Sequence, residues 1–124
     1  KLVGIHVRRT DYVKLGWDLK QEYFQNALNR FDSENTVFIC FTDDPEWCKK
    51  NLPTVVVYQG HKDYIDLFVL SRMDAYILSN SSFSWWAVFI GNSQKDKTVI
   101  APKRPWLNNN SYNPDIYESD WTLI

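Results

Sequence analysis

The sequence predicts an α/β fold built on a doubly wound, Rossmann-like parallel sheet of about five strands. Short apolar runs rich in β-branched and aromatic residues alternate along the chain with segments of helical apolar spacing. The first run, residues 2–8, is mostly apolar, as expected for a strand covered on both faces of its sheet. Because no internal repeat or Gly/Ser linker interrupts the alternation, we interpret the runs as one sheet with helical connections.

The remaining elements follow from apolar spacing and from capping residues. After a polar turn, Asp18 is expected to cap a helix whose apolar positions lie between Leu19 and Phe31. An aspartate before Pro45 predicts the start of a short helix. Two more helices are expected, one from Asp63 and a buried one over 82–91 that ends at Gly91. Further strands are expected at 36–42, 54–58, 75–79 and 97–102.

Length and composition predict one globular domain over residues 1–124. The chain is 44% hydrophobic, 23% charged and 16% aromatic, which excludes a disordered protein. Its net charge of -1 provides no general attraction for nucleic acid or an anionic membrane, so any phosphate site has to be local. No apolar segment reaches the ~18 to 20 residues that span a bilayer. Since the chain has no initiator Met and begins inside an expected strand, we expect a fragment of a longer protein.

The cysteines carry information about the compartment. Cys40 and Cys48 are the only two, and Cys40 lies in an apolar run interpreted as a buried strand. A disulfide is possible, but two buried or half-buried free thiols in a reducing compartment are favoured.

Two arginines follow the first strand, where ligands of doubly wound sheets bind. Arginine presents a planar, permanently charged fork that holds two phosphate or carboxylate oxygens. Strand alternation places Arg8 on the same side as His6, so Arg8 is favoured as the anion-binding residue. Taken alone, His6 would be a core histidine, and Arg9 is equally well interpreted as an ion-pair partner of Asp11.

The segment SNSSFSWWAVF, residues 79–89, follows the fourth expected strand. Ser81 and Ser82 occupy the turn before a helix, where free backbone N–H groups and hydroxyls favour an anion. A plain N-cap serine is the alternative. Trp85 and Trp86 are interpreted as structural residues that fill the core, in preference to sugar-binding platforms, because they lie in a short apolar helix.

Asp66 lies on an otherwise apolar helical segment, from which a carboxylate can accept hydrogen bonds from guanine N1–H and N2–H₂. A capping or surface carboxylate is the alternative for Asp66, as it is for Asp74. The sequence contains no Gly-rich phosphate loop, and its cysteine and histidine spacings match no zinc pattern. We therefore expect no metal site and no cofactor.

Together, these segments resemble the α-1,2-fucosyltransferase family, glycosyltransferase family 11. HVRRTDY at 6–12 and the stretch from Asp66 to Gly91 resemble its signature segments, and VIAPKRPW at 99–106 with ESDWTLI at 118–124 resemble its C-terminal end. The resemblance covers essentially the whole chain. Thr10 stands where the galactoside α-1,2 enzymes usually have glycine, and HVRRTD resembles the version in α-1,6-fucosyltransferases.

The resemblance implies the C-terminal, donor-binding half of a two-domain GT-B glycosyltransferase. It implies a GDP-fucose site in which Arg8 grips the β-phosphate and His6 with Asp66 recognises guanine. Ser82 and its neighbours, Ser81 and Phe83, would bind the same pyrophosphate. In a site without metal, an arginine can hold the charge that grows on the leaving diphosphate, so Arg8 is the expected catalytic residue and Arg9 an additional donor contact.

The expected function is transfer of L-fucose from GDP-fucose to a galactoside hydroxyl with inversion. A non-catalytic nucleotide- or sugar-binding module, a fucosyltransferase of different linkage (α-1,6-like or protein O-fucosyltransferase) and an interaction domain with exposed tryptophans remain alternatives. Asp11 is expected to pair with an arginine and Asp18 to cap a helix, so neither is favoured as the general base. The expected partners are GDP-fucose, a glycan acceptor and a missing N-terminal domain. A cytoplasmic bacterial parent is favoured over a Golgi membrane enzyme.

Overall fold

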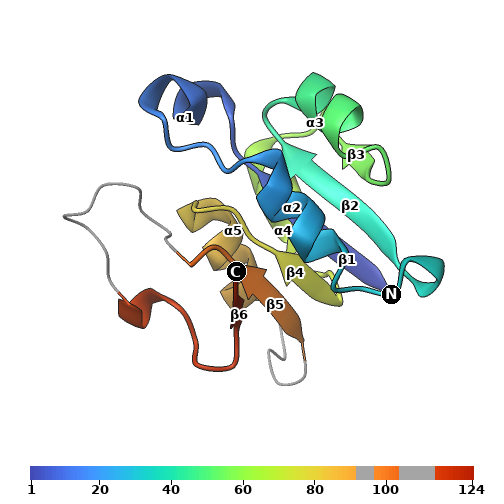
Figure 1. The fold of residues 1–124 in the computed structure, drawn as a ribbon, viewed down its shortest axis with the longest axis vertical. Coiled ribbons are helices and arrows are strands. Elements are labelled where there is room, and N and C mark those ends of the chain that lie inside the picture. The colour runs from blue at the N-terminus through green and yellow to red at the C-terminus, as the bar shows by residue number, and fades with distance from the viewer. Residues whose placement is uncertain (92–96, 104–113) are drawn as a thin grey trace.

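The computed structural model describes residues 1–91, 97–103 and 114–124. Within these ranges the chain forms a six-stranded sheet in which every pairing is parallel. The order β3-β2-β1-β4-β5-β6 (Figure 1) is that of the Rossmann fold. The strands are β1 (Leu2–Val7), β2 (Val37–Thr42), β3 (Val56–Tyr58), β4 (Ala75–Ile77), β5 (Thr98–Ala101) and β6 (Thr122–Leu123). The predicted α/β fold with a Rossmann-like parallel sheet is confirmed.

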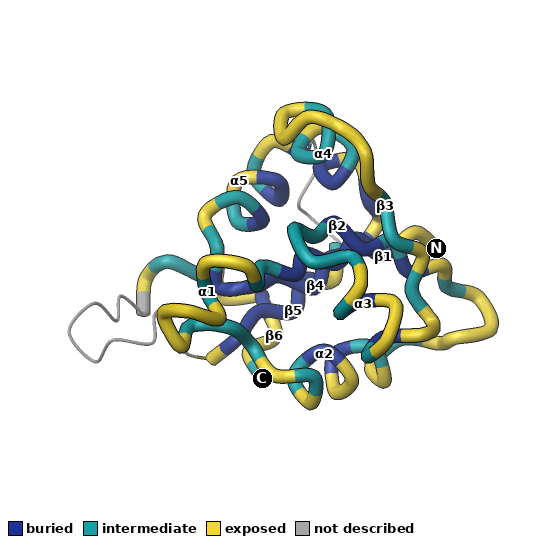
Figure 2. Tube along the Cα trace, turned by 90° about the horizontal axis from the view of Figure 1, so that it is seen from above, coloured by how far each residue is buried: buried dark blue, intermediate teal, exposed yellow. Residues whose placement is uncertain are grey.

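Helices cover both faces of this sheet. The described α-helices are α1 (Thr10–Leu15), α2 (Gln21–Leu28), α3 (Pro45–Asn51), α4 (Asp63–Leu70) and α5 (Ser82–Ile90). Two short 3₁₀ turns, η1 (Ser33–Asn35) and η2 (Pro114–Ile116), precede β2 and β6. Figure 2 shows α2 and α3 on one side of the sheet and α4 and α5 on the other. The layers are therefore helix, sheet and helix, as a parallel sheet buried on both faces requires.

The side chains of β1 point alternately to the two faces of the sheet, and each face carries one part of the hydrophobic core. Val3, Ile5 and Val7 are fully buried in the cluster that contains Phe24 of α2. Gly4 faces the other side, where the end of α4 packs so closely that a Cβ at this position would lie 2.5 Å from Leu70 Cδ1. Glycine at position 4 therefore allows α4 to lie directly on β1.

The predicted strands and helices agree with the structure to within a few residues, with three exceptions. The two-residue strand β6 and the helix α1 were not expected. Asp18 does not cap α2, whose N-cap is Lys20; the Asp18 carboxylate forms ion pairs with Arg9 and Lys20 instead. Residues 104–106 of the segment VIAPKRPW lie outside the described residues.

The two cysteines are free thiols and both are buried. Cys40 of β2 donates a hydrogen bond to Cys48 of α3 across 3.6 Å. The predicted free-thiol state is thus the one the structure shows, and the pair belongs to the packing between α3 and the sheet.

Candidate functional site

The strand order reverses between β1 and β4, which lie side by side at the centre of the sheet. The connection from β1 leads toward β2, and the connection from β4 leads toward β5. Such a switch point opens a crevice beyond the carboxyl ends of the strands, and ligands of α/β sheets bind there. Arg8 and Arg9 follow β1, and Leu78 to Ser81 follow β4. The segments singled out from the sequence therefore meet at one edge.

Two clefts open at this edge, on either side of the start of α5. The first, which we call the α4 cleft, has a volume of about 210 Å³ and is lined by residues that include His6, Arg8, Asp43, His61, Asp66 and Phe83. The second, the α5 cleft, has the same volume and is lined by residues that include Leu78, Asn80, Ser81, Ser82, Trp85 and Trp86. Of the predicted site residues, His6, Arg8, Asp66 and Phe83 thus share one cleft, whereas Ser81 and Ser82 line the other.

His6 lies at the carboxyl end of β1 with 7% of its surface exposed. Its Nδ1 is 2.7 Å from Ser79 Oγ, and its ring lies against Phe83 with 4.9 Å between centroids. Burial lowers the pKa of His6 to about 4, since the charged ring would lose its hydration. His6 is therefore a neutral imidazole at neutral pH. Among the described residues only Nδ1 has a hydrogen-bond partner, which leaves Nε2 for a ligand.

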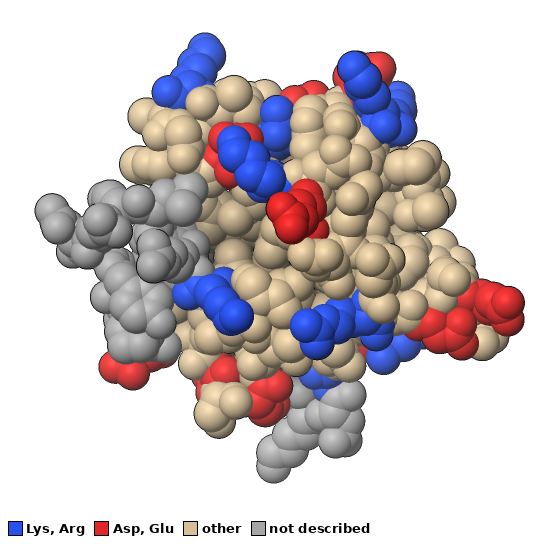
Figure 3. Space-filling model, in the orientation of Figure 1, with Lys and Arg blue, Asp and Glu red and all other residues tan. Residues whose placement is uncertain are grey.

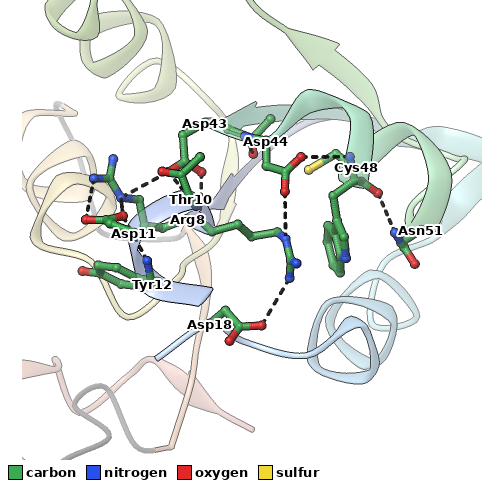
Figure 4. A network of polar contacts seen from close by, with 12 residues as sticks. Arg8, Thr10, Asp11, Tyr12, Asp18, Asp43, Asp44, Cys48 and Asn51 are labelled. Carbon is green, nitrogen blue, oxygen red and sulfur yellow. Dashed lines mark hydrogen bonds and ion pairs between the residues drawn. The ribbon is translucent and has the colours of Figure 1, made fainter. Parts of the chain in front are cut away.

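Arg8 extends into the α4 cleft with a half-exposed side chain. It donates from Nε and Nη2 to the two carboxylate oxygens of Asp11, at 2.9 and 3.1 Å (Figure 4). Its Nε also lies 3.3 Å from Asp43 Oδ2. Asp11 raises the pKa of Arg8, chiefly through these hydrogen bonds. Arg8 and His6 share a cleft, as strand alternation predicts, although β1 ends at Val7.

Arg9 is held differently and points away from Arg8. Its guanidinium lies 4.1 Å from the centroid of the Trp47 ring and forms ion pairs with Asp18 and Asp44, at 3.3 and 3.2 Å. Its side chain is only 14% exposed. The alternative interpretation of Arg9 as an ion-pair partner of Asp11 is not found, because Asp11 pairs with Arg8. The partners of Arg9 are Asp44, the N-cap of α3, and Asp18 before α2. Arg9 therefore joins the first two strand connections.

Asp43 was not singled out from the sequence and organises the turn after β1. Its carboxylate accepts from the backbone nitrogens of Arg9 and Thr10, at 2.8 and 3.2 Å, and from the Thr10 hydroxyl at 2.6 Å. These bonds satisfy donors at the start of α1, whose N-cap residue Arg9 provides no side-chain cap. The signal that could have found Asp43 is its place directly after β2, the strand that pairs with β1.

Asp66 lies in the first turn of α4 and lines the α4 cleft. Its Oδ1 is buried and has no hydrogen-bond partner among the residues that the structure describes. Desolvation raises the pKa of this carboxyl. Asp74, by contrast, accepts from the backbone nitrogen of Leu2 at 2.8 Å and has a structural role. A buried acceptor without a donor is costly, so the Asp66 carboxylate is suited to a ligand that donates hydrogen bonds.

The start of α5 is capped by Ser81, whose Oγ accepts from the backbone nitrogen of Phe83 at 3.3 Å. Ser81 is therefore an N-cap residue, as the alternative interpretation of this serine predicts. Ser82 is the first helical residue and is exposed on the wall of the α5 cleft. The helix dipole and the remaining N–H groups of this turn still favour an anion.

The interpretation of both tryptophans as core residues is wrong for Trp86. Trp86 is 54% exposed, and Ile90, one turn later, is 45% exposed. The buried face of α5 is made by Ser84, Ala87 and Val88, so positions 82, 86 and 90 form the opposite, solvent-facing side. Trp85 is partly buried. Its ring packs on Phe89 with 4.2 Å between ring centroids, and its Nε1 donates to the carbonyl oxygen of Ile116 at 2.6 Å.

Charges of both signs are interspersed over the face shown in Figure 3, in agreement with the net charge of -1. In the α4 cleft, the positive charge of Arg8 is set against the carboxylates of Asp43, Asp63 and Asp66. Among the described residues that line this cleft, Arg8 is the only Lys or Arg, so it provides the fixed positive charge for an anion that enters.

Comparison with known proteins places this arrangement in a family. The model of glycosyl transferase family 11 matches residues 1–124. The chain belongs to this family. The family 11 match covers both clefts and the turn between β1 and α1, so the predicted resemblance is confirmed. No solved structure matches the family 11 chain.

Curated relatives of the family 11 chain include bacterial and mammalian proteins. "Alpha-1,2-colitosyltransferase" of Escherichia coli is 34% identical, over 90% of this chain and 44% of its own length. "O-antigen biosynthesis glycosyltransferase WbnK" of Escherichia coli is 31% identical, over 86% of this chain and 40% of its own length. "Galactoside alpha-(1,2)-fucosyltransferase 2" of Mus musculus is 29% identical, over 85% of this chain and 35% of its own length. The chain thus spans less than half the length of these relatives.

The described part of this family 11 chain contains neither a membrane-spanning helix nor a cluster of metal ligands. Its helices are too short or too polar to cross a bilayer. Its His, Cys, Asp and Glu side chains form no group of three or more that could hold a metal ion in the ranges 1–91, 97–103 and 114–124.

Proposed function

We propose that the chain is the donor-binding domain of an inverting fucosyltransferase of the GT-B type, which transfers L-fucose from GDP-β-L-fucose to a galactoside hydroxyl in α-1,2 linkage. Family membership and the names of the relatives support glycosyl transfer. The observation that carries the choice of a guanine nucleotide is the unpartnered, buried Oδ1 of Asp66 in the α4 cleft. A second candidate donor carries colitose, because one of the relatives is named a colitosyltransferase.

Guanine fits the acceptor that Asp66 provides. Its N1–H and N2–H₂ are adjacent donors on one edge, and a carboxylate has two oxygens to receive them. Hydrogen bonds to a charged partner contribute about 1.5 to 3 kcal/mol each. Adenine, which lacks this pair of donors, would leave the Asp66 carboxylate unsatisfied. His6, neutral and fixed by Ser79, adds a ring nitrogen to the same cleft.

Arg8 holds the β-phosphate in this proposal. Its present partner Asp11 is exposed, and such surface pairs are weak because water competes for both charges. A diphosphate that brings more negative charge can therefore displace Asp11 and take the same bidentate fork. The start of α5 adds backbone N–H groups and the hydroxyls of Ser81 and Ser82.

The reaction follows from this placement. The acceptor oxygen attacks C1 of fucose while the bond from C1 to the β-phosphate oxygen breaks, so the configuration at C1 inverts. The bonding electrons leave with GDP, and the acceptor's proton passes to a base. Arg8 stabilises the charge that develops on the leaving diphosphate, and such preorganised donors contribute about 10²-fold to 10³-fold in rate. Asp11 and Asp18 are both paired with arginines, so neither is assigned as the base.

Calorimetric titration with GDP and IDP tests the proposal. IDP lacks only the 2-amino group, so it should bind about ten-fold or more weakly, since one hydrogen bond to a charged acceptor is lost. In Asp66→Asn, GDP should weaken while the difference between GDP and IDP largely disappears. Asp74→Asn is the matched control, because Asp74 lies outside both clefts. Equal binding of GDP, IDP and ADP would contradict a guanine site.

A further inference from the structure

The α5 cleft differs in chemistry from the α4 cleft. Its lining residues include Trp85, Trp86 and Leu78, and its polar lining residues include Asn80 and Ser81 of the loop between β4 and α5 and Ser82 of α5. Apolar walls with a few fixed polar groups are typical of sites for small organic ligands. Of the residues that line this cleft, Ser79, Ser81 and Ser82 have a role in the proposed function, whereas Trp85, Trp86 and Asn80 have none.

Trp86 is a fixed aromatic surface within this cleft. More than half of its surface is exposed, yet its ring is set by a perpendicular contact with Trp85, with 4.9 Å between centroids. Trp85 is held in turn by its hydrogen bond to the Ile116 carbonyl. A ring fixed in this way can receive an apolar ligand face without first losing side-chain freedom.

Asn80 adds an unused acceptor. The residue is 4% exposed, and its Nδ2 donates to the carbonyl oxygen of Trp17 at 2.9 Å, which fixes the amide. Its Oδ1 is buried and has no partner among the described residues. A hydroxyl group can supply the missing donor, and burial of an acceptor that stays unpaired is unfavourable.

The two clefts meet at the start of α5. Ser79 lines the α5 cleft and bonds through its hydroxyl to His6 of the α4 cleft. Ser82 and Phe83, adjacent in the first turn of α5, line the α5 and the α4 cleft respectively. A nucleoside diphosphate sugar has the same layout, with a base and a sugar on opposite sides of a diphosphate.

We infer that the α5 cleft binds the 6-deoxyhexosyl group of the donor, with the C6 methyl side against Trp86 and one sugar hydroxyl donating to Asn80 Oδ1. This inference rests on the proposed function, since it places the diphosphate at the start of α5. A 6-deoxy sugar is apolar at C6, where an ordinary hexose carries a hydroxyl. The apolar face of the Trp86 indole offers that hydroxyl no hydrogen-bond partner, so the cleft selects the deoxy sugar.

The test compares GDP-L-fucose with GDP-L-galactose, which differs only by a hydroxyl at C6. The chain should bind GDP-L-fucose about four-fold more tightly or better, the equivalent of burying one methyl group. Trp86→Ala should reduce this ratio to near one and leave the affinity for GDP unchanged. Trp86→Phe, which keeps an apolar ring, should retain part of the preference. Phe68→Ala is the control, because Phe68 is equally exposed at 56% and lies outside both clefts.

The outcomes separate the two proposals. If GDP itself does not bind, the proposed function fails, and this inference fails with it. If GDP binds but wild type shows no preference for the deoxy sugar, or Trp86→Ala keeps the full preference, the assignment of the α5 cleft is wrong while the guanine site stands. Thermal melting of each variant shows whether the fold is retained.

Discussion

Asp43 accepts two hydrogen bonds from Thr10, one from the backbone nitrogen at 3.2 Å and one from the hydroxyl at 2.6 Å. Asp43 follows β2 and Thr10 begins α1, so these bonds join the carboxyl ends of two neighbouring strands (Figure 4). The same carboxylate also contacts Arg8. The position of Arg8 in the α4 cleft therefore depends on a contact between residues 33 positions apart.

Removing the Thr10 hydroxyl should loosen this turn. Thr10→Val keeps the shape but loses the donor, and we expect a loss of about 0.5 to 1 kcal/mol in the free energy of unfolding, since the bond is exposed. Thr10→Ser, which keeps the hydroxyl, should stay close to wild type. Asp43→Asn should cost about 1 to 2 kcal/mol, because it weakens the cap of α1 as well. Chemical denaturation measures all three. A stable Asp43→Asn variant with unchanged GDP affinity would show that the turn is held by other contacts.

The strands and most helices were predictable because their apolar spacing is local. Helix α1 has no buried residue, so no apolar face marks it in the sequence. Strand β6 is only two residues long, too short for any pattern. The contacts of Asp43 and the stacking of Arg9 on Trp47 join separate strand connections, and the sequence contains no local trace of them.

Helix α5 shows a second limit of sequence patterns. Its residues after Ser84 are all apolar, so the sequence does not distinguish the face on the sheet from the face in solvent. Trp86 was assigned to the core for that reason and is exposed. The candidate site residues could be placed at the correct edge of the sheet, because that edge follows from strand direction. Their division between two clefts depends on where α5 lies.

The two tryptophans should respond differently to truncation. Trp85→Ala removes the contact with Phe89 and the bond to Ile116, and should cost about 2 to 3 kcal/mol of stability, below the 3 to 5 typical of a fully buried ring. Trp86→Ala should cost less than about 1 kcal/mol, because the side chain is mostly in water. Urea denaturation monitored by circular dichroism measures both. Equal losses would contradict the placement of Trp86 on the outer face.

The two arginines should separate binding from stability. Arg8→Lys keeps the charge but loses the fork, so GDP affinity should fall about ten-fold or more while the fold remains intact. Arg9→Lys should instead lower stability by about 1 to 2 kcal/mol, because it removes the stacking on Trp47 and the guanidinium that bonds Asp18 through Nη1 and Asp44 through Nε. Titration with GDP and denaturation of both variants test this. A larger binding defect in Arg9→Lys would mean that Arg9 is the phosphate ligand.

Nucleotide binding should not require a divalent cation, because in the proposed site Arg8 and the start of α5 bind the negatively charged diphosphate. We expect the same GDP affinity with EDTA as with Mg²⁺ or Mn²⁺. The matching control is Arg8→Ala, whose weakened binding should not be rescued by added metal. If chelation abolishes GDP binding in the wild type and Mn²⁺ restores it, the diphosphate is held by a metal and the role of Arg8 has to be reassigned.

The burial of His6 should make the fold sensitive to mild acid. Its pKa is about 4 in the folded state, against about 6.5 when exposed, so below pH 6.5 the unfolded chain binds a proton that the folded chain excludes. Stability should therefore fall as the pH decreases, by about 2 kcal/mol between pH 7 and pH 5 from this residue alone. Asp66, whose pKa is raised by desolvation, has the opposite dependence. Denaturation curves at pH 7, 6 and 5 measure the slope. His6→Gln cannot titrate but keeps a polar group near Ser79, so most of the change in stability with pH should disappear in this variant. If the change persists in full, groups other than His6 cause it.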